Sequence, residues 1–244
     1  MQTEEVTIIV PTRNEAQNIG AFLGSLPPMM KLIVVDASED GTPDIVAALR
    51  PHHTLLIHDR SNVTYARQIG GDAAATPWLM FTDADVIFSR NYFARLSTYN
   101  DYEALYGPKL SISNYAGYYR WIMRAQRLSD WLGMPAASGS NLLMSKPVFN
   151  EVGGFDLRLT CNEDSEIAWR IKRRGFPITF APDLIVYARD HRRLQRGALR
   201  KTLHSVTRCA LLYFNLMPDR WRSHDWGYWL RQDTVEKSDG TRRL

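Results

Sequence analysis

In residues 1–87, short apolar runs alternate with segments in which apolar residues recur at helical spacing. The apolar runs have the length of strands buried on both faces, and they occupy residues 6–10, 32–35, 54–57 and 78–81. The segments between them are predicted to be helices at 12–26, 43–49 and 62–75, with Asn14 as the cap of the first. This alternation predicts right-handed βαβ units, and therefore an α/β fold with a mostly parallel central sheet flanked by helices.

Beyond residue 87 the alternation is less regular. Helices are predicted at 91–99, 115–132, 147–152, 162–174 and 197–217, and strands at 104–112, 139–144 and 178–186. One face of helix 115–132 carries Tyr118, Ile122, Ala125, Leu128 and Leu132. The last helix is amphipathic too, and a polar tail follows it.

The chain has 244 residues, 45% of them hydrophobic and 23% charged, which is ordinary globular composition. Its two cysteines, Cys161 and Cys209, are too few for a disulfide framework or a zinc cluster, so a reducing compartment is expected. Apolar runs of about 18 residues are absent, and Glu4 and Glu5 directly precede the first strand. We therefore expect neither a transmembrane helix nor a signal peptide, and a soluble or peripheral protein.

The net charge of +4 is unevenly distributed along the chain. Residues 189–222 contain nine Arg or Lys against two Asp, a local charge of +7 that leaves about −3 for the rest. Such asymmetry indicates a face that meets phosphate, either on a ligand or on an anionic membrane surface. No nucleic-acid partner is expected.

The fourth apolar run ends in two carboxylates one residue apart, Asp83 and Asp85. At the carboxyl edge of an open α/β sheet, where ligands bind, two such side chains repel each other unless a cation lies between them. Mg²⁺ or Mn²⁺ carrying phosphates is the usual cation in such a place. Asp after a strand is also typical of a turn or a helix cap, and the pair alone does not decide between the two interpretations.

Further short motifs stand at strand ends or in the loops that follow them. Together the motifs are Val10-Pro-Thr-Arg-Asn-Glu15, Val35-Asp-Ala-Ser-Glu-Asp-Gly-Thr42, Ala66-Arg-Gln-Ile-Gly70, Thr82-Asp-Ala-Asp85, Gly139-Ser-Asn141, Gly153-Gly-Phe-Asp156 and Glu163-Asp164. In this order the sequence resembles glycosyltransferase family 2, the inverting enzymes of GT-A fold that use nucleotide-diphospho-sugars. The resemblance implies a catalytic domain at 1–195, with a Rossmann-like nucleotide-sugar-binding half at 1–87 and an acceptor half at 88–195. A C-terminal helical extension would follow at 196–244.

The resemblance implies a donor pocket at the first strand ends. Its expected nucleotide-sugar-binding residues are Pro11, Thr12, Asn14, Glu15, Asp36, Ser38, Arg67, Gly70, Asp83, Ala84 and Asp85. Glu15 and Asp36 would accept hydrogen bonds from base and ribose, and Arg67 would meet the base or the diphosphate as a fixed cation. Asp83 would contact the ribose and the water shell of the metal, and Asp85 would bind the Mg²⁺ or Mn²⁺ directly.

The resemblance also implies which acid carries out proton transfer. Asp164 would be the general base for the acceptor hydroxyl, in a single displacement that inverts the anomeric carbon. An acid at this position is also favourable simply as part of a helix N-terminus. The acceptor side is expected to hold Gly139, Ser140, Asn141 and Glu163.

A basic motif downstream, Asp190-His191-Arg192-Arg193, is the candidate for further contacts with the leaving group. His191 would be a metal ligand beside Asp83 and Asp85, whereas Arg192 and Arg193 would contact the diphosphate. A lone histidine is more often structural, and that interpretation stays open. The Gln-x-x-Arg-Trp motif of processive polysaccharide synthases is absent, so we expect one sugar to be added per encounter.

The expected reaction moves one sugar from a UDP-sugar, or next GDP-mannose, to an acceptor hydroxyl or lipid phosphate. Helix 115–132 and segment 196–229 combine aromatic, aliphatic and basic residues, a profile typical of a helix on an anionic membrane but also of core packing with a basic face. A lipid-linked or membrane-proximal acceptor is therefore favoured, with the protein cytoplasmic or peripheral on the cytoplasmic face of a membrane.

Two alternatives remain: a nucleotide-sugar-binding protein without transfer activity, and a sugar nucleotidyltransferase, whose usual Gly-rich loop residues 11–17 do not supply. The first strand is not followed by Gly-x-Gly-x-x-Gly, which argues against a dinucleotide oxidoreductase.

Overall fold

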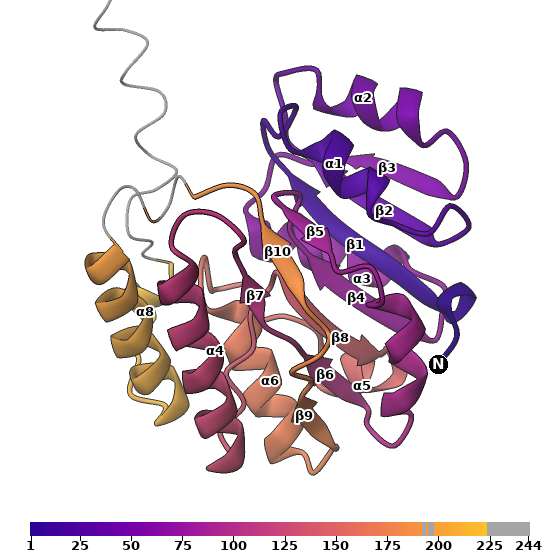
Figure 1. Ribbon diagram of the computed structural model, residues 1–244. Coiled ribbons are helices and arrows are strands. Elements are labelled where there is room, and N and C mark those ends of the chain that lie inside the picture. The colour runs from indigo at the N-terminus through magenta and orange to yellow at the C-terminus, as the bar shows by residue number, and fades with distance from the viewer. Residues whose placement is uncertain (192–193, 195–197, 224–244) are drawn as a thin grey trace, which may run out of the picture.

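The computed structural model describes residues 1–191, 194 and 198–223, and Figure 1 shows how their helices and strands are arranged. The strands are β1 (Val6–Thr12), β2 (Lys31–Asp36), β3 (Thr54–His58), β4 (Trp78–Thr82), β5 (Val86–Phe88), β6 (Ala104–Tyr106), β7 (Lys109–Leu110), β8 (Asn141–Ser145), β9 (Ile178–Phe180) and β10 (Val186–Ala188). The α-helices are α1 (Ile19–Gly24), α2 (Thr42–Leu49), α3 (Val63–Ala73), α4 (Ala116–Trp131), α5 (Lys146–Glu151), α6 (Glu163–Arg173), α8 (Ala198–Tyr213) and α9 (Asp219–Arg222). Two 3-10 helices are η1 (Thr3–Glu5) and η2 (Phe93–Tyr99).

Within the described residues, the larger sheet has the strand order β3-β2-β1-β4-β8-β6-β9. Strands β3, β2, β1 and β4 are parallel to one another, as the strand–helix alternation of residues 1–87 predicts. β8 runs antiparallel to both β4 and β6, whereas β6 and β9 are again parallel. The predicted α/β fold with a mostly parallel central sheet is therefore confirmed.

Both faces of this sheet are buried, which explains why its central strands read as continuous apolar runs. On one face, Ile8 and Val10 of β1 belong to the cluster that contains Phe22 of α1. On the other face, Ile9 packs in the cluster that contains Phe149 of α5 and Ile167 of α6. The alternation of side chains along β1 thus supplies both hydrophobic layers.

Gly70 lies where α3 crosses the sheet. A Cβ atom on Gly70 would come within 2.3 Å of Cγ2 of Ile9, so the helix reaches this distance from β1 only with glycine there. In this structure Gly70 packs α3 onto the sheet, whereas the resemblance implies a place for it in the nucleotide pocket.

The predicted strand 104–112 is divided between two sheets. β6 belongs to the large sheet, whereas β7 joins a small sheet of order β5-β10-β7. The chain changes sheet at Gly107, where a Cβ atom would meet the carbonyl oxygen of Leu184 at 2.1 Å. The predicted strand 178–186 is divided in the same way, into β9 and β10.

The first predicted helix is wrong at its start. Thr12 still belongs to β1, Asn14 adopts a left-handed conformation with φ 56°, and the helix begins only at Ile19. Asn14 is therefore not the helix cap, and Asn18 occupies that position instead. The predicted helix 91–99 is a 3-10 helix over Phe93–Tyr99.

Helices α4 and α8 lie side by side at the left of Figure 1. The hydroxyls of Tyr118 and Thr202 connect them by a 3.0 Å hydrogen bond, and α8 also packs on α6. The apolar face predicted for α4 is only partly covered, since Leu128 and Leu132 remain exposed. In the part of the chain that the structure describes, no helix has the length and apolar character needed to cross a membrane.

Candidate active site

A pocket of about 1210 Å³ opens beyond the carboxyl ends of β1 and β4. Residues of these strand ends form one wall, and residues of α4 and α8 form the opposite wall. Ten of the residues singled out in the sequence line this pocket: Pro11, Thr12, Glu15, Asp83, Ala84, Asp85, Gly139, Ser140, Asp164 and His191. An open α/β sheet places its ligand site at this edge, so the pocket lies where the fold class predicts.

The remaining described candidates lie outside the pocket lining, namely Asn14, Asp36, Ser38, Arg67, Gly70, Asn141 and Glu163. Asn141 in β8 is buried, and its side chain donates to the carbonyl of Leu184 and accepts from the hydroxyl of Tyr92. It therefore fixes the join between the two sheets, behind the expected acceptor side. The predicted diphosphate contacts Arg192 and Arg193 lie outside the described residues.

Asp36 holds together the ends of β1 and β2. Its Oδ1 accepts hydrogen bonds from Thr12 Oγ1 at 2.6 Å and from Ser38 Oγ at 2.7 Å. Ser38 in turn accepts from the backbone amide of Asn14 at 2.9 Å, and Asn14 Oδ1 accepts from the amide of Glu39 at 2.9 Å. The loop that follows Thr12, the last residue of β1, is thereby fixed at the rim of the pocket.

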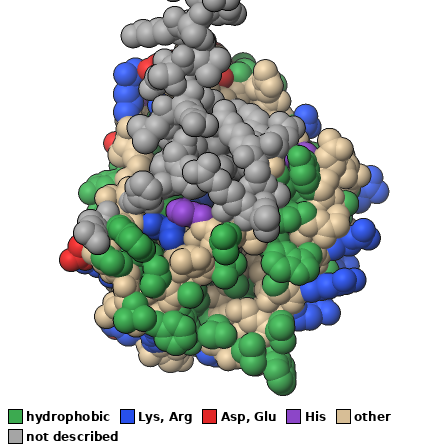
Figure 2. Space-filling model, turned by 90° about the vertical axis from the view of Figure 1, so that its left-hand side faces the viewer, with side chains coloured by type: hydrophobic (Ala, Val, Ile, Leu, Met, Phe, Trp, Pro, Cys, Tyr) green, Lys and Arg blue, Asp and Glu red, His purple; other side chains and the backbone are tan. Residues whose placement is uncertain are grey.

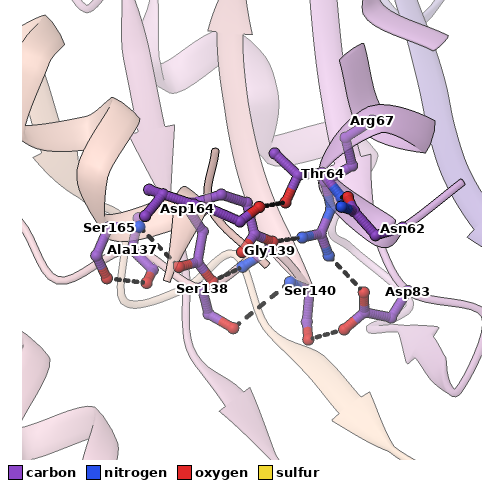
Figure 3. A network of polar contacts seen from close by, with 12 residues as sticks. Asn62, Thr64, Arg67, Asp83, Ala137, Ser138, Gly139, Ser140, Asp164 and Ser165 are labelled. Atoms are coloured by element: carbon purple, nitrogen blue, oxygen red, sulfur yellow. Dashed lines mark hydrogen bonds and ion pairs between the residues drawn. The ribbon is translucent and has the colours of Figure 1, made fainter. Parts of the chain in front are cut away.

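Arg67 is the centre of a buried ionic network (Figure 3). Its guanidinium reaches Asp83 Oδ1 at 2.7 Å through Nη2 and forms an ion pair with Glu163 through Nη1. The second oxygen of Asp83 accepts from the hydroxyl of Ser140. Burial alone would lower the pKa of Arg67, but Glu163, Asp83 and Asp164 together raise it above its ordinary value. Arg67 therefore stays charged and orients Asp83, and its head group is directed at carboxylates, whereas we expected it to meet the donor.

Gly139 allows the backbone to pass directly over this guanidinium. A Cβ atom on Gly139 would come within 2.4 Å of Arg67 Nη2, so a larger residue would displace either the arginine or the loop. The amide of Gly139 donates to Asp164 Oδ2 at 2.6 Å. One glycine thus joins the ionic network to the candidate base (Figure 3).

The side chains of the consecutive acids Glu163 and Asp164 have different surroundings. Glu163 is 4% exposed and pairs with Arg67, whereas Asp164 lines the pocket. Asp164 Oδ1 accepts from the amide of Ser165 at 2.7 Å, and Oδ2 accepts from Gly139. Burial raises the pKa of Asp164, and neighbouring Asp83 adds to this, although Arg67 and the two amides oppose it. Of the two acids, Asp164 is the one that a ligand in the pocket can touch.

Asp85 faces the pocket beside a lysine. Lys109 Nζ lies 3.0 Å from Asp85 Oδ1 and 3.4 Å from Ser140 Oγ. Burial alone would lower the pKa of Lys109, but Asp85 and Asp83 together raise it. The structure shows no hydrogen bond from a described residue to Oδ2 of Asp85. That oxygen is suited to one coordination bond with a hard divalent cation, whose remaining ligands a diphosphate and water would supply.

The predicted metal-binding trio of Asp83, Asp85 and His191 is not assembled. Among residues 1–191, 194 and 198–223, no three His, Cys, Asp or Glu side chains come together in a way that could hold a metal ion. Both oxygens of Asp83 already accept from protein donors, so Asp85 is the side chain that fits a metal. His191 lies against Tyr119, whose hydroxyl is 3.4 Å from Nδ1, and its Nε2 is 3.3 Å from Ser111 Oγ.

Several lining residues had no recognisable signal in the sequence. Lys109 was placed inside a continuous strand, and only the change of sheet at Gly107 brings it to Asp85. The loop of residues 59–62 and Cys209 of α8 also line the pocket. Burial raises the pKa of Cys209 to about 12, so its thiol is not a nucleophile at neutral pH.

The mostly parallel α/β sheet carries two acids beyond β4 and a third at the start of α6, at the edge where open α/β folds bind their ligands. The sequence model of glycosyl transferase family 2 matches residues 7–153, more than half of the chain. The chain therefore belongs to glycosyltransferase family 2.

Curated relatives share about a quarter of the sequence. The chain is 25% identical over 223 residues to the pre-mycofactocin glycosyltransferase of Mycobacterium tuberculosis, an alignment that covers 85% of this chain and 47% of the relative. It is 24% identical to the succinoglycan biosynthesis protein ExoA of Rhizobium meliloti, over 78% of this chain and 66% of the relative. The chain thus spans about half to two thirds of the length of these relatives.

Solved structures share the fold. The mannosyltransferase PcManGT of Pyrobaculum calidifontis, in complex with GDP-Man and Mn²⁺, superimposes with a TM-score of 0.64 at 24% identity, covering 75% of this chain and 56% of that one. S. aureus TarS 1-349, in complex with UDP-GlcNAc, gives a TM-score of 0.65 at 15% identity and covers 97% of this chain and 78% of that one.

Proposed function

We propose that this protein is an inverting glycosyltransferase that moves one sugar from a nucleotide-diphospho-sugar to an acceptor, with a divalent metal bound at Asp85. A UDP-sugar is the preferred donor and GDP-mannose the next. The observation that carries the proposal is that Asp85 and Asp164 line one pocket. Their neighbours in the sequence, Asp83 and Glu163, form ion pairs with Arg67.

The sheet edge supports a donor in this pocket. Thr12 and Glu15 lie at the end of β1 and Asp83 at the end of β4, where nucleotides bind in folds of this class. PcManGT and TarS are related in fold and were solved with GDP-Man and UDP-GlcNAc, respectively. Both nucleotides therefore belong in the first donor panel.

In the proposed reaction, the carboxylate of Asp164 takes the proton of the acceptor hydroxyl as that oxygen bonds to the anomeric carbon. The bond from the anomeric carbon to the diphosphate oxygen breaks, and the nucleoside diphosphate leaves with the electron pair. The metal, when bound, would neutralise charge on that leaving group. Attack opposite the leaving group inverts the anomeric configuration, and Asp164 ends protonated. Its raised pKa suits the task, because a base with a higher pKa accepts a proton more readily.

The opposite wall of the pocket supports an acceptor with an apolar portion. Trp121, Ile122 and Ala125 of α4 and Val206 of α8 line it. Figure 2 shows apolar side chains gathered on the face of the molecule that carries these helices. Trp131 and Leu203 are exposed on the same two helices. The sequence of residues 189–222 adds a basic excess of +7. A lipid-linked acceptor at an anionic membrane, on the cytoplasmic face, fits this combination of apolar and basic groups.

The proposal is tested by measuring nucleotide release and sugar transfer from a panel of UDP- and GDP-sugars with Mn²⁺ or Mg²⁺. Asp85→Ala is expected to lose metal-dependent donor binding, whereas Asp164→Ala keeps donor binding and loses transfer by about 10²–10⁴-fold.

Glu166→Ala, in the first turn of α6 but paired with Arg170, is the matched control and should retain transfer. A protein that binds the donor with metal but never releases the nucleotide would instead be a binding protein. Full transfer by Asp164→Ala would exclude that residue as the base.

A further inference from the structure

Lys109 is a partly buried lysine at the point where the donor and metal are proposed to bind. Its side chain is 17% exposed, and its ammonium contacts Asp85 Oδ1 and lies 3.4 Å from the hydroxyl of Ser140. Removing an ammonium from water is costly unless it is paired. In this structure the pairing is supplied by the same carboxylate that fits a metal.

The small sheet holds this lysine against Asp85 from two directions. Val186 of β10 pairs with Lys109 of β7 and with Phe88 of β5. One residue beyond β10, the amide of Arg189 donates to the backbone oxygen of Asp85 at 2.8 Å. The pairing of these strands therefore fixes the backbone positions of Lys109 and Asp85 relative to each other.

The two binding partners proposed for this site affect the lysine in opposite ways. A bare divalent cation approaching Asp85 meets the ammonium already on Oδ1, and like charges repel. A nucleoside diphosphate brings phosphate oxygens, with which a lysine ammonium pairs readily. The lysine thus disfavours the metal alone and favours the diphosphate.

We propose that Lys109 is the resident counter-ion of Asp85, which keeps divalent metal off the donor-free protein and contacts the diphosphate once the donor binds. The inference rests on the proposed function, since it takes the donor to be a nucleoside diphosphate derivative. Metal and nucleotide then bind interdependently, because each removes a cost of binding the other. Lys109 is in this sense a binding residue that sets the order of assembly.

The test compares wild type with Lys109→Met by isothermal titration calorimetry. Mn²⁺ is titrated without nucleotide, and UDP and GDP are each titrated in EDTA. Lys109→Met is expected to bind Mn²⁺ about tenfold more tightly and the nucleotide about tenfold more weakly. Lys172→Met, which removes an exposed lysine from α6, is the matched control and should change neither affinity.

Lys109→Gln provides a second variant, because glutamine keeps hydrogen-bonding groups near Ser140 and Asp85 without the charge, and it is expected to behave like Lys109→Met. Mn²⁺ affinities of folded variants within about twofold of wild type would overturn the proposal, as would unchanged nucleotide affinity in EDTA. Failure of wild type to bind UDP or GDP even with Mn²⁺ would instead overturn the proposed donor. The Mn²⁺ titration contains no nucleotide, so the two failures are distinguishable.

Discussion

The two walls of the pocket differ in secondary structure and in the type of side chain that they present. The sheet-edge wall, formed by Thr12, Asp83, Asp85, Gly139 and Asp164, consists of polar groups that follow buried elements. The helical wall, formed by the pocket-lining residues of α4 and α8, presents tryptophan, isoleucine, alanine and valine together with tyrosine, glutamine, serine, threonine and histidine side chains. Apolar side chains of these two helices also remain exposed beyond the pocket.

The difference indicates how each wall selects its ligand. On the sheet-edge wall, polar groups are already paired with protein partners: Thr12 with Asp36, Asp83 with Arg67, and Asp164 with the amide of Gly139. Such a wall offers a fixed set of charges to one kind of ligand. The helical wall adds apolar area beside its polar side chains, and apolar contacts are not directional, so this wall can accommodate different apolar groups. We therefore expect stability to depend on the first wall and acceptor choice on the second.

The largest effect should follow removal of the buried cation. Arg67→Met would leave Asp83 and Glu163 without their shared counter-ion, and breaking a buried pair on one side costs about 3–5 kcal/mol. The free energy of unfolding, measured with urea, should fall by that amount. Arg174→Met removes an exposed pair with Glu151 and should change it by no more than about 1 kcal/mol. Equal effects of the two variants would contradict the paired character of the sheet-edge wall.

Patterns of nearby residues predicted much of the sheet-edge wall. The strands of residues 1–87 are continuous apolar runs because both sheet faces are covered, and such runs can be recognised without knowing their partners. Asp83 and Asp85 followed from their position directly after β4. The start of the first helix was wrong because Ser38 and Glu39, from the next strand end, hold Asn14 outside a helix.

The site contacts that the sequence analysis did not predict join residues that are distant along the chain. The resemblance to the family implied that Arg67 meets the donor, and nothing local to Arg67 indicates Glu163, its partner 96 residues away. Lys109 reaches Asp85 only because Gly107 fits under the carbonyl of Leu184. Such placements depend on tertiary packing, which hydrophobic periodicity does not encode.

A smaller loss should follow crowding of the arginine. Gly139→Ala places a Cβ atom about where the guanidinium of Arg67 lies, and overpacking of this kind costs about 1–3 kcal/mol. Because the amide of Gly139 also contacts Asp164, transfer should fall together with stability. Gly117→Ala is the matched control, since a Cβ there meets nothing within 4 Å and alanine favours the helix. A stable and active Gly139→Ala protein would show that this loop shifts freely.

The pH dependence of transfer should report Asp164, the candidate base on the sheet-edge wall. The pKa of Asp164 is raised by burial and by Asp83, and lowered in part by Arg67 and by the amides of Gly139 and Ser165. The base must be ionised, so kcat/KM should fall about tenfold per pH unit below this raised pKa. The free energy of unfolding has the opposite pH dependence. The contribution of Asp164 to it is fully present below the pKa that Asp164 has in the unfolded chain, and it is lost as pH rises through the raised pKa of the folded state. Asp164→Asn should remove this contribution, and a wild-type activity profile that is flat in acid would contradict the assignment.

The smallest effect on stability, and a specific effect on binding, is expected at the helical wall. Trp121 and Trp131 of α4 are exposed, so changing both to Gln should alter the free energy of unfolding by no more than about 0.5 kcal/mol each. If these residues meet a membrane or lipid-linked acceptor, co-sedimentation with anionic vesicles should drop, because each buried aromatic contributes about 1.5–3 kcal/mol. Met29→Gln, at a position whose exposure lies between those of the two tryptophans but outside α4 and α8, is the matched control and should leave vesicle binding intact. Unchanged vesicle binding by the double variant, with transfer to soluble sugars at the wild-type rate, would leave the helical wall without the role proposed for it.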